Sequence, residues 1–125
     1  MRNFTPSAVR QMSAVEAAWR GAILEGEGSA WSGVYRSGPR SYPQRVVRVD
    51  IKNSDPEVLS ACLRFVGAGN VYGRPAAERG PIRATKPMFH WVLQARNSVL
   101  DFLRQVAPYC PKAQAVLEKE NAHGV

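Results

Sequence analysis

The sequence predicts one α+β domain in which four strands form a sheet that carries helices on one face only. Three observations predict it. The 125 residues suffice for one hydrophobic core and are too few for two domains. Apolar residues recur at helical spacing in separate segments, and polar and apolar residues alternate strictly from Gln44 to Lys52. The predicted order is αββαββα followed by a terminal helix, within a single domain over residues 1–125.

The first half of the chain predicts a helix followed by two paired strands. Ser13 to Glu16 has the pattern of a capping box and opens a helix to about Glu25. Residues 29–36 predict a strand, and "SGPRSYP" predicts a turn because of its prolines and glycine. The next strand runs over residues 44–52 and places Val47, Val49 and Ile51 on its core face.

The second half repeats the pattern of two strands and a helix around a second turn. Residues 53–57 predict a helix start with Pro56 in the first turn, and Gly67 or Gly69 ends this helix. "NVYGR" predicts the third strand and "MFHWVLQA" the fourth, joined by a loop rich in proline and arginine.

The last part of the chain is predicted to be helical and then frayed. We expect Asn97 or Ser98 to cap a helix that Pro108 ends. A short helix follows from about Lys112, and residues 118–125 are expected to form a frayed tail.

The chain is strongly basic, and its charge favours a polyanionic partner. Seventeen Lys and Arg against ten Asp and Glu leave a formal charge of +7. The positive residues lie on strands and the loops that join them, at Arg36, Arg40, Arg45, Arg48 and Lys52 and at Arg74, Arg79, Arg83 and Lys86. A β-ribbon fits the major groove of duplex DNA while basic loops contact phosphate. The alternative is a solvated basic surface.

Other partners and compartments are less well supported. No stretch approaches the roughly 18 apolar residues of a membrane span, so we expect no membrane partner, and we expect no small-molecule substrate. Cys62 and Cys110 are interpreted as small buried hydrophobes rather than a disulfide, and the cysteines and histidines have no zinc spacing. With no export signal, we expect a cytoplasmic location; organellar encoding stays open.

The stretch "RGAILEGEGS", residues 20–29, contains an electrostatic anomaly. Glu25 and Glu27 stand at the predicted end of an apolar helix, where the helix dipole is negative and favours cations. Acids at this place therefore predict that something positive binds near them.

This stretch resembles the signature of the LAGLIDADG homing endonucleases, in the variant that ends Glu-Gly-Glu-Gly. Arg20 replaces an apolar residue of the motif, and the small pair appears as Gly21-Ala22, in reversed order. The resemblance extends to "VDIKNSDPEVLSACLRFVGAGNVYGR" and to "RNSVLDFLRQVAPYCPKAQ" and so covers nearly the whole chain. It implies the αββαββα fold of this family, whose four-stranded antiparallel sheet forms a DNA-binding saddle.

The resemblance also implies a metal site and a homodimer. Glu27 and the carbonyl of Gly26 would bind Mg²⁺, or another divalent cation such as Mn²⁺, at the scissile phosphate. Because one chain has one motif, a partner subunit would supply the second Glu27. The helices would pair through a face of small residues, with Glu25 as a structural acid at the same interface: Ala18, Gly21, Ala22 and Glu25.

Two further catalytic residues are implied, each with an alternative. Asn53 stands where the family places a polar residue that holds the water network, but it could equally be a helix cap. Lys112 stands near the family's catalytic lysine, although its spacing from Pro108 and Tyr109 is one residue short. Its alternative is an ordinary solvated lysine.

Strand alternation then predicts the DNA-facing side chains. On the first strand, the side chains expected to pack beneath the sheet are Ala30, Ser32 and Val34. On the fourth strand, they are Phe89, Trp91 and Leu93. Gly33, Val46, Met88 and Val92 would face outward. The expected DNA contacts, with a surface histidine as the alternative for His90, are Ser29, Trp31, Tyr35, Arg40, Gln44, Arg48, Asp50, Asn70, Tyr72, Arg74 and His90.

Together these features predict a site-specific double-stranded DNA endonuclease that acts with a divalent metal on a long pseudo-palindromic site. One alternative is a non-cleaving LAGLIDADG-type protein that binds DNA or RNA as a regulator or maturase. A basic structural protein would explain the charge but not the acids at the helix end.

Overall fold

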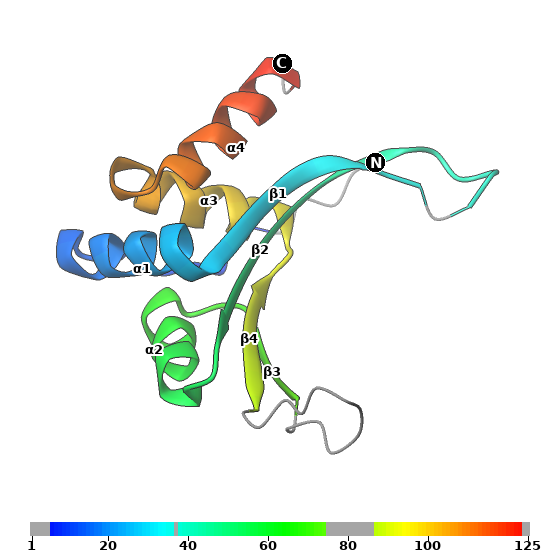
Figure 1. The fold of residues 1–125 in the computed structure, drawn as a ribbon. Helices are drawn as coiled ribbons and strands as arrows, with labels where there is room; N and C mark the ends of the chain where they lie inside the picture. Colours follow the sequence, from blue (N-terminus) through cyan, green and yellow to red (C-terminus); the bar gives the residue numbers. More distant parts are fainter. Residues whose placement is uncertain (1–5, 37, 75–86, 124–125) are drawn as a thin grey trace.

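The computed structural model describes residues 6–36, 38–74 and 87–123 and has one layer of helices packed on one face of a sheet (Figure 1). The elements are α1 (Ala14–Glu27), β1 (Gly28–Tyr35), β2 (Gln44–Asn53), α2 (Pro56–Val66), β3 (Asn70–Arg74), β4 (Met88–Leu93), α3 (Arg96–Val106), a 3₁₀ turn (Ala107–Tyr109) and α4 (Pro111–His123). This order confirms the predicted α+β architecture.

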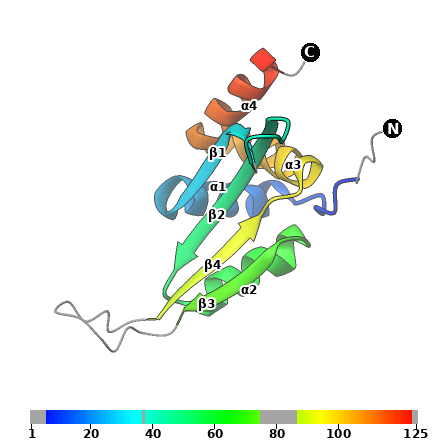
Figure 2. The ribbon, with the colours of Figure 1, turned by 90° about the vertical axis from the view of Figure 1, so that its right-hand side faces the viewer.

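All neighbouring strands of the sheet are antiparallel, in the order β1-β2-β4-β3. Figure 2 looks onto the open face of this sheet, with the helices behind it. The two long strands β1 and β2 form a ribbon, and the shorter β3 forms the opposite edge. In the part of the chain that the structure describes, no helix covers the open face.

The hydrophobic core lies between the sheet and the helices. Val47, Val49 and Ile51 of β2 are completely buried, as alternation predicts. Trp91 of β4 is also fully buried, its ring centroid lies 5.2 Å from that of Phe102, and its Nε1 donates to the carbonyl of Ala68 at 3.0 Å. The indole thus packs in the core with its one polar atom satisfied.

Two of the predicted helix starts and one helix end are confirmed. Ser13 and Glu16 form the capping box of α1 in both directions. Asp55 caps α2 with Pro56 in its first turn, and Gly67 ends this helix in the left-handed conformation at φ 81°.

The predicted cap of α3 is wrong. The helix begins after Ala95, without a side-chain cap, so neither Asn97 nor Ser98 is the cap. Ser98 is instead buried, and its hydroxyl accepts a hydrogen bond from the backbone N–H of Ala8 at 3.0 Å. A long-range contact thus uses the serine that local sequence assigned to a cap.

The predicted frayed tail is also wrong for residues 118–123, which continue α4. Glu120 is only 4% exposed, and its carboxylate oxygens lie 2.6 Å from an Arg45 nitrogen and 2.9 Å from an Arg96 nitrogen. Burial opposes ionisation of this carboxyl, but hydrogen bonds from Arg45, Arg96 and Ser32 outweigh it and lower its pKa to about 2. Arg45 therefore anchors α4 to the helix side of the sheet.

Two valines keep the predicted sheet face but differ from the burial expected for that face. Val34 is 59% exposed, because the end of the β1–β2 ribbon extends beyond the helices that cover the rest of the sheet (Figure 1). Val92, predicted to face outward, is only 4% exposed, since it lies on a central strand between Asp50 and Asn70. Both differences follow from the position of the residue in the sheet.

The two cysteines are free thiols and are buried, as predicted. Burial raises the pKa of the Cys62 thiol and that of the Cys110 thiol. Among the described helices, none has the length and apolarity needed to cross a membrane.

Candidate active site and nucleic-acid interface

The candidate active site lies where α1 passes directly into β1. Glu27 is the last residue of α1, and its side chain is exposed. Asn53 ends β2 next to it and donates from Nδ2 to Glu27 Oε2 at 2.6 Å. The Oδ1 atom of Asn53 accepts from the backbone N–H of Asp55 at 2.8 Å, which fixes the amide in this orientation. Asn53 is therefore not the cap of α2, and it brings β2 to the candidate metal ligand.

Lys112 reaches the same junction from the first turn of α4. Its Nζ donates to the carbonyl of Gly28 at 2.8 Å, one residue after Glu27. Its side chain is half-buried. The structure thus brings together the three residues expected in catalysis, which are far apart in sequence: Glu27, Asn53 and Lys112.

The first acid of the motif, Glu25, has a partner of its own. Its Oε1 accepts from the backbone N–H of Lys112 at 2.9 Å, in the first turn of α4, and lies 3.5 Å from the Cys110 sulfur. The start of a helix carries unpaired N–H groups and a positive dipole end. Glu25 therefore caps α4, which explains one acid at the negative end of α1 and ties α1 to the backbone of Lys112.

The junction has the donor chemistry that a hard divalent cation needs. Glu27 presents a carboxylate, and the exposed Gly26 lies in the last turn of α1, where carbonyls have no N–H partner in the same helix. A Cβ at Gly26 would meet nothing within 4 Å, so this backbone is open to approach. Among the described residues, no three His, Cys, Asp or Glu side chains form a metal-binding cluster. The Glu27 carboxylate and the Gly26 carbonyl are thus the protein oxygens that this junction offers to such a cation.

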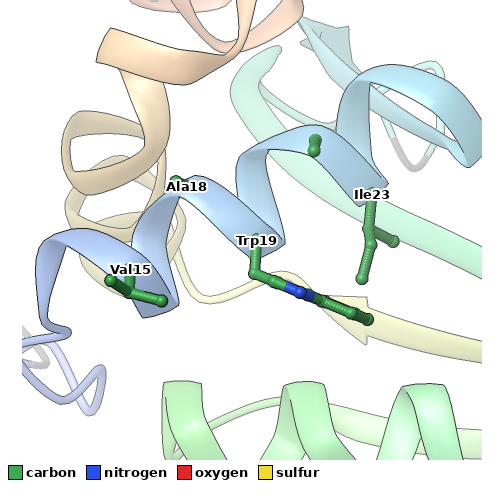
Figure 3. A pocket seen from close by; sticks show the side chains of 5 residues that line it. Val15, Ala18, Trp19 and Ile23 are labelled. Atoms are coloured by element: carbon green, nitrogen blue, oxygen red, sulfur yellow. The ribbon is translucent and has the colours of Figure 1, made fainter.

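The outer face of α1 is apolar and forms a hollow of about 490 Å³ (Figure 3). Trp19 is 55% exposed and Val15 is 75% exposed. The side chains that line the hollow recur along one side of the helix: Val15, Ala18, Trp19, Ala22 and Ile23. Val15, Trp19 and Ile23 were not among the residues predicted to lie at an interface, although their spacing of four residues places them on one side of the helix.

The four residues expected at a dimer interface fall on two sides of α1. Ala18 and Ala22 lie on the outer, apolar face. Gly21 packs inside the chain, since a Cβ there would meet Tyr109 Cβ at 3.1 Å and the carbonyl of Val106 at 3.2 Å. Glu25 also makes its contact within the same chain, where it accepts from the backbone of Lys112 in α4. The small residue at Gly21 thus serves the close approach of α1 to the end of α3.

Arg20, which departs from the motif, is accommodated by stacking. The side chain is 5% exposed, and its guanidinium lies 4.4 Å from the ring centroid of Phe65 and 5.5 Å from that of Trp19. Its NH2 group donates to the carbonyl of Ala61 at 3.4 Å. A planar guanidinium can replace an apolar residue here because its faces pack on aromatic rings.

The open face of the sheet carries most of the expected DNA contacts. Trp31 is 49% exposed, Tyr35 56% and Tyr72 55%, so these aromatic side chains stay accessible. Ser29, Gln44 and Asn70 are exposed on the strands, and Arg40 is exposed in the turn between β1 and β2. The backbone of Arg74 ends β3, while its side chain and the loop residues Arg79, Arg83 and Lys86 lie outside the described residues.

A polar cluster crosses this face from β2 to β4. Arg48 NH2 lies 3.4 Å from Asp50 Oδ2, and His90 Nδ1 lies 3.1 Å from Asp50 Oδ1. Beside the cluster is a hollow of about 580 Å³, lined by Trp31, Tyr35, Val46, Arg48 and Gln94. Gln94 was not among the predicted contacts, although the alternation of His90 and Val92 in the predicted fourth strand extends to it.

The comparisons with known proteins support the fold. The sequence matches no protein-family model and no curated protein. The structure is similar to that of the homing endonuclease I-CvuI in complex with its target, at TM-score 0.62 and 18% identity, over 84% of this chain and 65% of that chain. It is also similar to the archaeal intron-encoded homing endonuclease I-Vdi141I complexed with DNA, at TM-score 0.55 and 15% identity, over 76% of this chain and 55% of that chain.

A third similar structure is the LAGLIDADG homing endonuclease I-SmaMI bound to cleaved DNA, at TM-score 0.53 and 16% identity, over 86% of this chain and 37% of that chain. The chain spans less than two thirds of the length of these three proteins. At such identities the similarity concerns the backbone, and it agrees with the element order and the sheet described above. The chain therefore has the LAGLIDADG homing endonuclease fold.

Proposed function

We propose that this chain is a site-specific double-stranded DNA endonuclease that acts as a homodimer on a long pseudo-palindromic site. One observation carries the proposal: Asn53 holds the Glu27 carboxylate at 2.6 Å beside the carbonyl that Lys112 contacts at 2.8 Å. This group stands at the end of a basic, aromatic-bearing sheet face that has no helix over it in the described part of the chain. A carboxylate, an amide and an ammonium group beside a DNA-sized surface suit phosphodiester hydrolysis.

The proposed cofactor is Mg²⁺, or another divalent cation such as Mn²⁺. Glu27 and the carbonyl of Gly26 would hold it, because hard cations prefer carboxylate and carbonyl oxygens. When bound, such an ion polarises the phosphate and lowers the pKa of a bound water. Asn53 would orient the Glu27 carboxylate, and Lys112 would supply a positive charge at the same junction.

The proposed homodimer follows from the geometry of α1. One chain presents a single Glu27, whereas cutting two strands requires two such sites. The outer face of α1 supplies an apolar surface that continues to within a few residues of Glu27: Val15, Ala18, Trp19, Ala22 and Ile23. Pairing of two copies along this face would bring both helix ends toward one place and form a twofold protein. Such a protein binds a DNA site with matching symmetry.

The engagement of Lys112 favours the alternative function, a binding protein without cleavage activity. Its Nζ contacts a backbone carbonyl and its side chain is half-buried, which limits its reach to a phosphate. A selection of cleaved sites from a random DNA library with Mg²⁺ separates the two functions. We expect cleaved sequences that share an imperfect palindrome. Specific binding without cleavage under any divalent metal would show the alternative, and the absence of any sequence preference would reject both.

Replacing Ala22 with tyrosine should dissociate the dimer and abolish cleavage together. Ala22 lies on the outer face of α1, where a bulky side chain would hold a second helix away. The measurement is the molar mass by light scattering beside strand cleavage. Ala122→Tyr, at an exposed alanine near the end of α4, is the matched control and should change neither. A wild-type chain that is monomeric and cuts DNA would contradict the proposed dimer.

A further inference from the structure

We infer that His90 reads the amino group of an adenine or a cytosine in the major groove through its Nε2 atom, and that Asp50 sets the tautomer that makes this contact. This inference rests on the proposed function, because it concerns the DNA that the open sheet face would bind. Adenine N6 and cytosine N4 are the hydrogen-bond donors that bases present in the major groove. A side chain that recognises these amino groups must therefore offer a hydrogen-bond acceptor.

The position of His90 suits a contact with a base edge. In the sheet, His90 of β4 stands directly opposite Lys52 of β2 on one side and Tyr72 of β3 on the other. Its neighbours in sequence, Phe89 and Trp91, pack with the core on the opposite face. Lys52, the strand partner of His90, is followed in β2 by Asn53, which donates to Glu27. His90 therefore lies in the row of side chains next to the candidate active site.

The contact with Asp50 determines which histidine nitrogen carries the proton. Asp50 Oδ1 lies 3.1 Å from His90 Nδ1, and an ionised carboxylate can only accept hydrogen bonds. The proton of a neutral imidazole must then sit on Nδ1, which leaves the lone pair on Nε2. His90 therefore presents an acceptor to the groove while it is neutral.

Asp50 was expected to contact DNA directly, but both of its carboxylate oxygens have partners within the sheet. Arg48 lies 3.4 Å from its second oxygen and offsets its charge, so both oxygens are engaged within the sheet. The carboxylate is 14% exposed, against 22% for His90. Asp50 thus acts through His90 as a positioning residue.

The test is a binding selection from a randomised DNA library with the full chain and without divalent metal, at about pH 8. We expect adenine or cytosine at one symmetric pair of positions near the centre of the site. His90→Ala should reduce the preference at these positions by about tenfold and leave the others unchanged.

Three variants separate tautomer control from a merely structural effect. Asp50→Asn keeps the shape of the side chain but can both donate to and accept from Nδ1, so it no longer fixes the tautomer and should weaken the preference, as should Asp50→Ala. Lys52→Ala, in the same row, is the matched control and should weaken binding to all sequences alike. Melting temperatures of the variants show whether each one folds.

Two results would overturn the inference. The first is specific binding whose preference at every position survives His90→Ala. The second is an equal loss of base preference at every position of the DNA site in a folded His90→Ala variant. If the wild-type chain showed no sequence preference for DNA, the proposed function itself would fail, which is a different outcome from either.

Discussion

Replacing Glu27 with glutamine should abolish Mg²⁺-dependent strand cleavage and leave specific DNA binding intact. Glutamine keeps the size of the side chain and can still accept a hydrogen bond from Asn53, but it lacks the charge that a divalent cation needs. Binding should persist or tighten, since each subunit loses one negative charge near the phosphates. The measurement is strand cleavage beside binding affinity, for wild type and variant on the same DNA.

Glu25→Gln is the matched control, two residues earlier on the same helix. Glu25 caps α4 through the backbone of Lys112, so its replacement should lower the free energy of unfolding by about 1 kcal/mol and leave cleavage per folded molecule nearly unchanged. Normal cleavage by the Glu27→Gln variant would show that the motif is not part of the active site. Equal loss of cleavage in both variants would assign the two acids one shared role.

Acidification should destabilise the fold through Glu120. Its pKa is lowered from an ordinary value of 4.5 to about 2, because hydrogen bonds from Arg45 and Arg96 outweigh the effect of burial. A carboxyl whose folded pKa is lowered stabilises the protein above its unfolded pKa. That stability is lost as the pH falls from about 4.5 to about 2, and its size is about 3 kcal/mol. Urea unfolding measured across this window checks it.

Glu120→Gln should remove most of this pH dependence and lower the stability at neutral pH. Arg45 and Arg96, which are both partly exposed, would then lose the carboxylate that they share, and the loss of stability should not exceed the value of about 3 kcal/mol that the pKa shift of Glu120 implies. Glu16, whose pKa is lowered by hydrogen bonds from Ser13, should leave a smaller residual slope. Parallel pH curves for wild type and variant would contradict the role of Glu120.

Most of the fold could be predicted because its signals are local. The capping box at Ser13, the proline in the first turn of α2 and the strict alternation in β2 each depend on residues next to one another. The errors occurred where a distant residue takes part. Ser98 contacts the N-terminal segment, and Glu120 extends α4 by binding Arg45 and Arg96.

The candidate site could be predicted as a set of residues but not as a set of contacts. Glu27, Asn53 and Lys112 came from the motif and its flanking segments, and the structure places them together. Local sequence does not show which side of α1 a residue faces when both sides bear small residues, so Gly21 and Glu25 were placed on the outer face. Their partners, Tyr109 and Lys112, lie more than eighty residues away.

The lysines of α4 have a consequence for how copies of this protein can associate. β1 is an edge strand, and Lys112 Nζ and Lys119 Nζ occupy its carbonyls at Gly28 and Ser32, both at 2.8 Å. An uncovered edge is a template on which another chain can add a strand, and repeated addition leads to open-ended fibres. Two occupied carbonyls and two ammonium groups along β1 oppose that addition. The proposed pairing along the apolar side of α1 would instead join two copies into a closed pair, which cannot grow further.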